Sequence, residues 1–437
     1  MAQTQHEDEL YLCESRSDKR LFSSDILFRT PRRRRSATES ESESADHQNF
    51  IYFCAAVQAL ELDFLPITWQ PHAGLIGRGG TSEIRQSLLS LEVSLAFKAI
   101  HVRDDLRTRT DEGLESIFSL LMAEIQHMGM KAIRNSAYIH KVEGICWSVN
   151  RDTGVVDPIL VYEKARYGDM DYFVTSGQGK SLDLLGRVKL CRDVAVGLET
   201  LHCCSRSCTA LRSETSILTV GSGIVHGDVK PENVLMMDFD GVAVPQVADF
   251  GYSATYTSIE LTVVVSRTAP WHAPEVGRRM DGYLPIEAIR TDIFSFGMMC
   301  LWVLFGCDVV NHYGITRDFA NNHKCGEDAH DPSFKIINQL KEQDELRSFC
   351  RDQIQSLDLE PGQSEHLTKL FEMTLSPNAT DRASSLQQIL EHLNSFLRSK
   401  LGDQAEPMVY NVAEDVALRQ HYDFEVKLLP TTPSVHT

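Results

Sequence analysis

Apolar residues return at Phe50 after a polar N-terminal stretch, and their spacing then changes along the chain. The apolar run at 50–65 predicts a short helix that leads into the folded part. Short strand-like runs follow, PITWQ, LIGRGG and VSLAFKAI, and in the last of them apolar residues alternate with smaller or polar ones. A period of two is typical of a half-buried strand. We therefore expect mainly β-structure before residue 100.

Helical spacing begins near residue 112 and dominates the second half of the chain. Apolar residues at 112–130 recur three and four positions apart, as on one face of a helix. Two more strand candidates follow, KVEGICW and PILVYEK, and after Asp183 the pattern is mostly helical to about Leu397. The longest apolar run, at 293–307, is shorter than the about 18 residues of a membrane span and indicates a buried core helix. A β-rich part followed by a helical part predicts an α+β, two-lobed fold.

Both ends of the chain have the composition of unstructured tails. Residues 1–48 hold four consecutive arginines at 32–35, directly before an acidic Ser/Glu block, and contain few apolar residues. The arginines are compatible with nuclear import or a phosphorylation site, although a solvated tail is the simpler interpretation. Residues 398–437 form the second predicted tail. The predicted domain is thus 70–397, with lobes at about 70–164 and 165–397.

Charge and cysteine content narrow the possible classes of protein. Asp and Glu total 61 against 43 Lys and Arg, a net charge of −18, which disfavours a general nucleic-acid-binding role. The 11 cysteines are an odd number without regular spacing, and the acidic N-terminus lacks the segments of a signal peptide. We therefore expect reduced thiols in a cytoplasmic protein, with nuclear localisation left open by the arginine block.

The segment IVHGDVKPENVL, at 224–235, carries the strongest chemical signal. Phosphoryl transfer needs a carboxylate to orient the attacking hydroxyl, an amide oxygen to hold a metal ion and a cation to neutralise the phosphate. Asp228, Asn233 and Lys230 would supply these groups. The segment VADFGYS begins 14 residues after Asn233 and adds Asp249 as a second candidate magnesium ligand.

A glycine-rich turn and a lysine precede this segment. Gly77, Gly79 and Gly80 lie between two predicted strands, where glycines let the backbone approach phosphate groups closely. Lys98 follows on the next predicted strand. Glu124 lies on the next predicted helix, where its carboxylate could clamp the lysine. These residues are therefore candidates for binding a nucleotide.

In this order the motifs resemble those of the eukaryotic protein kinase family over residues 70–397. The order is the glycine turn, Lys98, Glu124, HGDVKPEN, DFG, APE, Asp292 and Arg382. The resemblance implies a bilobal kinase fold, ATP and Mg²⁺ as cofactors, and an ion pair between Glu275 of APE and Arg382. Lys230 and Thr268 are similar to the Ser/Thr class rather than the Tyr class.

The resemblance implies a role for each candidate residue. Asp228 would be the catalytic base and Lys230 would stabilise the transferred phosphate, while Asn233 and Asp249 would bind Mg²⁺. The nucleotide would be bound by ten residues around its phosphates and adenine: Leu75, Gly77, Gly79, Gly80, Ile84, Ala96, Lys98, Glu124, Tyr162 and Glu163.

Three features depart from the family pattern. Gly227 replaces the arginine that usually precedes the catalytic Asp, a non-RD pattern that argues against control by phosphorylation of the activation loop. Ser82 stands where a third loop glycine is common. An insertion at 203–222 follows His202 where the family has a short turn.

The expected activity is transfer of the ATP γ-phosphate to Ser or Thr hydroxyls of a protein substrate. Two alternatives stay open. A nucleotide-binding pseudokinase scaffold is motivated by Gly227, Ser82 and the insertion, and small-molecule kinases share a related catalytic loop. We expect no nucleic-acid partner and no membrane span, and the sequence leaves the substrate and the oligomeric state open.

Overall fold

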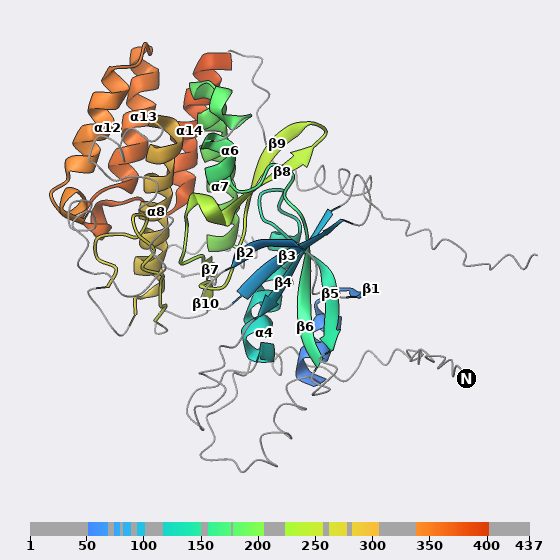
Figure 1. The fold of residues 1–437 in the computed structure, drawn as a ribbon. Helices are drawn as coiled ribbons and strands as arrows, with labels where there is room; N and C mark the ends of the chain where they lie inside the picture. The colour runs from blue at the N-terminus through green and yellow to red at the C-terminus, as the bar shows by residue number, and fades with distance from the viewer. Residues whose placement is uncertain are drawn as a thin grey trace, which may run out of the picture. The chain divides into compact units, whose positions relative to one another are not determined.

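The computed structural model describes residues 51–68, 74–78, 82–88, 94–100, 117–149, 156–175, 178–204, 223–256, 262–277, 282–305 and 338–401 (Figure 1). Several predicted features lie outside these residues: the tail at 1–48, nearly all of the tail at 398–437, most of the insertion at 203–222, and the loop glycines Gly79 and Gly80.

The β-rich part forms one six-stranded sheet in the order β1-β5-β6-β4-β3-β2. β1 runs parallel to β5, and every other neighbouring pair is antiparallel. The strands are β1 (Phe64–Thr68), β2 (Gly74–Arg78), β3 (Ser82–Leu88), β4 (Ser94–Ile100), β5 (Val142–Val149) and β6 (Val156–Glu163). All five strand-like segments of the sequence are strands here, and β3 has no counterpart among the predictions.

The two faces of β4 carry different kinds of residue. Leu95, Phe97 and Ala99 point to one face, where they form a buried apolar core with Cys146, Ile159 and Val161. Leu65 and Ile67 of β1 pack against this core. Ala96 and Lys98 alternate with these residues, so they lie on the opposite face. The period of two in the sequence therefore separates core residues from candidate site residues.

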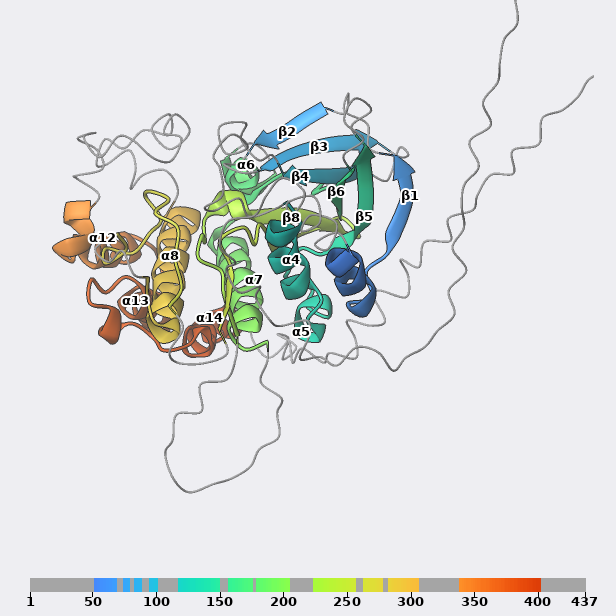
Figure 2. The same ribbon diagram turned by 90° about the horizontal axis from the view of Figure 1, so that it is seen from below.

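Helices cover the Lys98 face of the sheet. α4 (Ile117–Met128) and α5 (Lys131–Arg134) lie beneath it, next to a helix at 51–59 (Figure 2). In that N-terminal helix Phe53 is fully buried, and its ring meets Trp147 of β5 edge-on at 6.1 Å between centroids. Arg134 Nη1 donates to the carbonyl of Leu60 at 3.1 Å. Residues 51–68 thus belong to the folded sheet and its helices, upstream of the domain start predicted at 70.

The second half of the chain is mostly helical, as predicted. Its helices are α6 (Met170–Thr175), α7 (Leu184–His202), α8 (Pro285–Phe305), α12 (Glu345–Gln355), α13 (Pro361–Thr374) and α14 (Leu386–Leu401). α8 is long and apolar enough to span a membrane by length and composition, but 89% of its most apolar stretch is buried inside the protein. It is the core helix that the apolar run predicts. The α+β architecture expected from the sequence is therefore confirmed.

Two short antiparallel strand pairs lie between α7 and α8 in the sequence. β8 (Val234–Phe239) pairs with β9 (Val242–Val247), and β7 (Gly223–Val225) pairs with β10 (Ala254–Tyr256). The β8–β9 hairpin turns at Asp240 and Gly241, both with positive φ (51° and 83°), as a two-residue type I′ turn requires. These pairs flank the segments that carry the candidate catalytic residues.

Replacing Phe53 by Ala should destabilise the protein by about 3–5 kcal/mol, because the substitution leaves a cavity beneath Trp147. The neighbouring Tyr52 is 59% exposed, so Tyr52→Ala should cost at most about 0.5 kcal/mol. Urea unfolding of the two variants and the wild type measures both effects. Equal losses would contradict the packing of the N-terminal helix against the sheet.

Candidate active site

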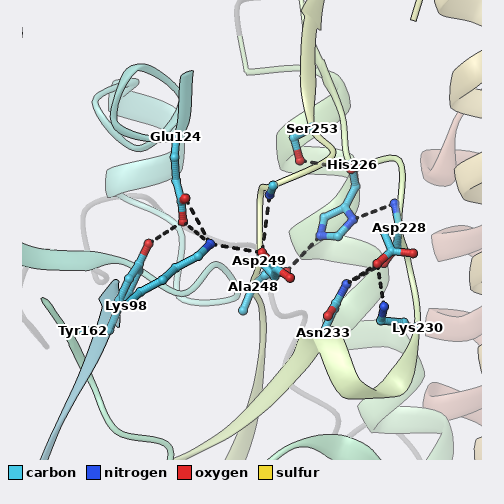
Figure 3. Close-up of polar contacts among 11 residues, drawn as sticks. Lys98, Glu124, Tyr162, His226, Asp228, Lys230, Asn233, Ala248, Asp249 and Ser253 are labelled. Carbon is cyan, nitrogen blue, oxygen red and sulfur yellow. Dashed lines mark hydrogen bonds and ion pairs between the residues drawn. The ribbon is translucent and has the colours of Figure 1, made fainter. Parts of the chain in front are cut away.

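Lys98 is the centre of a buried ion cluster between the sheet and the DFG segment. It lies on β4 with 7% of its surface exposed. Its Nζ donates to both carboxylate oxygens of Glu124 on α4, at 2.8 and 3.0 Å, and to Oδ1 of Asp249 at 3.1 Å (Figure 3). Burial alone would lower the pKa of Lys98, but the two carboxylates outweigh it and raise the pKa above its ordinary value. Lys98 is therefore charged at neutral pH.

Tyr162 completes this cluster from β6. Its hydroxyl donates to Oε1 of Glu124 at 2.6 Å, and His140 stacks on its ring at 5.2 Å between centroids. Burial and the adjacent Glu124 carboxylate raise the pKa of Tyr162, so the hydroxyl stays protonated. Glu124 is thus held by two donors from two strands. The sequence assigned Tyr162 to the nucleotide alone and gave no sign of this second bond.

Asp228 is held on both carboxylate oxygens. Lys230 Nζ donates to its Oδ2 at 2.6 Å, and the hydroxyl of Thr268 donates to its Oδ1 at 2.6 Å. Asn233 Nδ2 donates to Oδ2 at 3.1 Å and to the Asp228 carbonyl at 2.8 Å. The amide of Asn233 is thereby oriented with its Nδ2 end on Asp228, which leaves its Oδ1 end suited to ligate a cation. The three predicted catalytic-loop residues therefore come together.

The catalytic loop is fixed from below by Asp292, eight positions into α8. This carboxylate is 1% exposed and accepts three hydrogen bonds. The backbone N–H groups of His226 and Gly227 donate at 2.8 and 2.9 Å, and His202 Nε2 lies 3.0 Å from Oδ2. The order of the motifs predicted Asp292 as part of the kinase pattern, whereas its contact with His202 was not predicted.

Asp249 stands between the two groups of residues in Figure 3. It adopts positive φ (61°), an uncommon conformation for a residue other than glycine, and 48% of its side chain is exposed. The charge of Lys98 lowers the pKa of Asp249, so the carboxylate is ionised. The backbone on either side is anchored, since Ala248 N donates to the carbonyl of Asn233 at 2.8 Å and the rings of His226 and Phe250 pack at 5.6 Å. An exposed, ionised carboxylate beside an amide oxygen forms a donor set that suits Mg²⁺.

The pairing of the strands shows on which face of the sheet each predicted adenine-binding side chain lies. Ile84 pairs with Lys98, and Ala96 pairs with Tyr162, so these side chains share the Lys98 face. Leu75 pairs with Arg85, which pairs with Phe97, so Leu75 lies on the opposite, core face. The register of β2 shifts between Leu75 and Gly77, and the place of Leu75 at an adenine site stays a prediction.

The other predicted positions are placed as follows. Gly77 lies in β2 opposite Ile84, and Glu163 is the last residue of β6, where burial raises its pKa to about 6. Glu275 and Arg382 form a bidentate ion pair at 2.6 and 2.8 Å. Gly79 and Gly80 stay predictions.

Comparison with known proteins agrees with this arrangement. The profile described as "Protein kinase domain" matches residues 72–394. The chain belongs to the protein kinase family. A probable LRR receptor-like serine/threonine-protein kinase of Arabidopsis thaliana is 27% identical over 284 residues, which are 64% of this chain and 23% of that protein. The cysteine-rich receptor-like protein kinase 6 of Oryza sativa subsp. japonica is 26% identical over 250 residues, 56% of this chain and 30% of that protein.

The kinase fold predicted from the sequence is thereby shown, with a β-rich N-terminal lobe and a helical C-terminal lobe. The aligned part of the chain spans only about a quarter of the first Arabidopsis relative. The helix at 51–59 and β1 lie upstream of the matched residues, so this kinase domain carries an N-terminal addition to its sheet.

Gly227 adopts a conformation that favours glycine at the position before Asp228. Its φ is +79°, and a Cβ placed there would lie 2.8 Å from the carbonyl oxygen of Tyr252. Its own carbonyl accepts from Ser266 N at 2.8 Å, and its N–H donates to Asp292. An arginine at this position would meet both the unfavourable φ and the Tyr252 backbone.

The Gly227→Ala variant should therefore lose about 2–4 kcal/mol of stability, since it combines backbone strain with a steric clash. Gly241 is a matched control, because its φ is +83° but nothing lies within 4 Å of a Cβ placed there. Gly241→Ala should cost only about 1–2 kcal/mol. Thermal or urea unfolding distinguishes the two, and an equal loss in both variants would show that the contact with Tyr252 is relieved without cost.

Proposed function

We propose that this kinase domain is an active protein Ser/Thr kinase, which transfers the γ-phosphate of ATP to Ser or Thr hydroxyls of a protein substrate. The observation that carries the proposal is the state of Asp228. Asp228 is 6% exposed and its carboxylate is held between the Lys230 ammonium and the Thr268 hydroxyl, with Asp249 of the DFG segment between it and the Lys98 cluster (Figure 3). A base in this position can orient an incoming hydroxyl and accept its proton.

Each residue has a task that its contacts prepare. Lys98, kept charged by Glu124 and Asp249, would bind phosphate oxygens of ATP, and Lys230 would neutralise charge on the group being transferred. Asn233 and Asp249 would hold the divalent cation, which would supply positive charge to offset that of the phosphates. Ile84, Ala96 and Tyr162 would line the adenine site, with the backbone of Glu163 at its edge. Positioning and electrostatics supply most of the rate in this reaction.

The Ser/Thr preference is proposed from two contacts. Lys230 lies two residues after Asp228 and bonds to it, and Thr268 closes the other side of the same carboxylate. The names of two Arabidopsis relatives, both probable LRR receptor-like serine/threonine-protein kinases, point the same way.

Lys98→Met and Asp228→Asn should each lower the rate of phosphate transfer to a degenerate Ser/Thr peptide library by about 10²–10⁴-fold. Asp228→Asn retains the shape of the loop, so its circular dichroism and melting temperature should stay close to those of the wild type. Labelled ATP, purified protein and Mg²⁺ provide the assay. Transfer at the wild-type rate in Asp228→Asn would refute the proposed base.

A pseudokinase scaffold is the competing function, and Gly227 is the observation that favours it, because it removes the arginine that most active family members carry. A thermal shift on addition of ATP and Mg²⁺ without any peptide phosphorylation would identify the scaffold. A shift together with phosphorylation supports the enzyme.

A further inference from the structure

Lys341 is a buried lysine that no motif of the sequence singles out. It lies in a helix at 338–342 with 1% of its surface exposed, and its Nζ donates to the carbonyl oxygen of His272 at 2.7 Å. Placing an ammonium group in a protein interior is costly unless polar partners replace its water. A lysine kept here should therefore contribute something that an apolar side chain could not.

The groups that face Lys341 come from three elements. Phe294 of α8 presents its ring with the centroid 5.7 Å from Nζ, within reach of a cation–π interaction. The same ring has the Arg382 guanidinium at 4.7 Å, and Arg382 is paired with Glu275. Burial lowers the pKa of Lys341 to about 7; Glu275 opposes this shift and Arg382 adds to it. The Lys341 amine therefore lies beside the Glu275–Arg382 ion pair, in which the two opposite charges already offset each other.

The carbonyl that Lys341 binds closes a turn that begins at the active site. The N–H groups of Trp271 and His272 donate to the carbonyl of Thr268 at 3.0 and 3.1 Å. At the other end of the turn, the Thr268 hydroxyl donates to Asp228 at 2.6 Å. Lys341 thus holds one end of the turn at 268–272 while Asp228 is bonded to the other.

We propose that Lys341 is a positioning residue for phosphate transfer, which fixes the turn at 268–272 through the His272 carbonyl and so keeps the Thr268 hydroxyl on Asp228. The proposal rests on the kinase activity proposed above. If Lys341 only filled space, an apolar side chain of the same length could replace it without lowering the rate of phosphate transfer. ATP binding by Lys98 and Asp249 is remote from this contact, so Lys341 should affect turnover rather than ATP affinity.

The test compares Lys341→Met, which removes the donor, with Lys341→Gln, which retains an N–H donor without the charge. Lys369→Met is the matched control, because Lys369 is a half-exposed lysine on α13 paired with Glu372. We expect kcat to fall about 10-fold or more in Lys341→Met with the KM for ATP within about 2-fold. Lys341→Gln should recover part of kcat, and Lys369→Met should match the wild type.

Hydrogen exchange provides a readout that does not need activity. Amides at 266–275 should exchange faster in Lys341→Met than in the wild type or in Lys369→Met. Unchanged exchange, unchanged kcat, or equal kcat in the Met and Gln variants would each overturn the proposal. If the wild type transfers no phosphate at all, the proposed function fails, while the exchange experiment still decides whether Lys341 holds the turn.

The pH dependence of stability checks the burial of the amine. The pKa is about 7 in the folded protein and 10.5 without burial, so between these values the unfolded chain holds a proton that the folded chain lacks. Stability must therefore rise with pH across this window, and the cost is greatest below pH 7. Relative to Lys341→Met, the melting temperature of the wild type should rise about 2 °C per pH unit from pH 7 to 9. A constant difference would overturn the assignment of a costly buried amine.

Discussion

The catalytic loop of this kinase domain depends on one buried carboxylate, that of Asp292. It has almost no contact with solvent and must therefore be satisfied within the protein. The donors it finds are two backbone N–H groups of the HGD segment and the ring of His202 at the end of α7. Most residues of α8 are buried in the C-terminal lobe, so hydrogen bonds to Asp292 on this helix limit the movement of the loop. Asp228 then projects from a backbone that cannot shift without leaving a buried charge unpaired.

The second constraint links the lobes through charge. Lys98 comes from the sheet and Asp249 from the DFG segment, and each makes the charged form of the other more favourable. Glu124 joins only if α4 lies against the sheet, and Tyr162 holds it there with a neutral hydrogen bond. The upstream helix at 51–59 packs on the same side of the sheet, beside α5, and so supports the layer that contains α4. The positions of Lys98 and Glu124 therefore depend on the helices that pack on the sheet, and not on the loop residues alone.

The sequence was sufficient to predict the residues whose type the reaction requires. It was insufficient to predict residues whose role depends on contacts with distant parts of the chain. Asp228, Lys230, Asn233, Asp249, Lys98 and Glu124 could be found because phosphoryl transfer demands these residue types in this order, and the structure brings them together. The β8–β9 hairpin carried a readable signal, an Asp-Gly pair between apolar runs, that the predictions did not use. The bulge that shifts the register of β2 beside Leu75 could not be predicted, because the pairing that shows it is non-local.

Other features have no local signature at all. The Tyr162 hydroxyl, the His202 ring and the Lys341 amine meet partners 38, 90 and 69 positions away. Their roles follow from packing, which a single sequence does not encode in any short segment. Burial of a lysine is also contrary to the usual rule, so composition would place Lys341 on the surface.

The segment around Gly227 is held by hydrogen bonds from several parts of the C-terminal lobe. Its N–H is taken by Asp292 and its carbonyl by Ser266, and the hydroxyl of Ser253 donates to the carbonyl of His226. β10 then pairs with β7, and Tyr256 donates to the carbonyl of His202. The contacts of the Gly227 carbonyl, Ser253 and Tyr256 join neutral groups and are short-ranged, whereas the Gly227 N–H donates to the carboxylate of Asp292. The described part of this segment is therefore held in place by contacts within the protein. The turn at 268–272 reaches Asp228 through the Thr268 hydroxyl, and the helix at 51–59 packs through Phe53 on Trp147 of the sheet that carries Lys98.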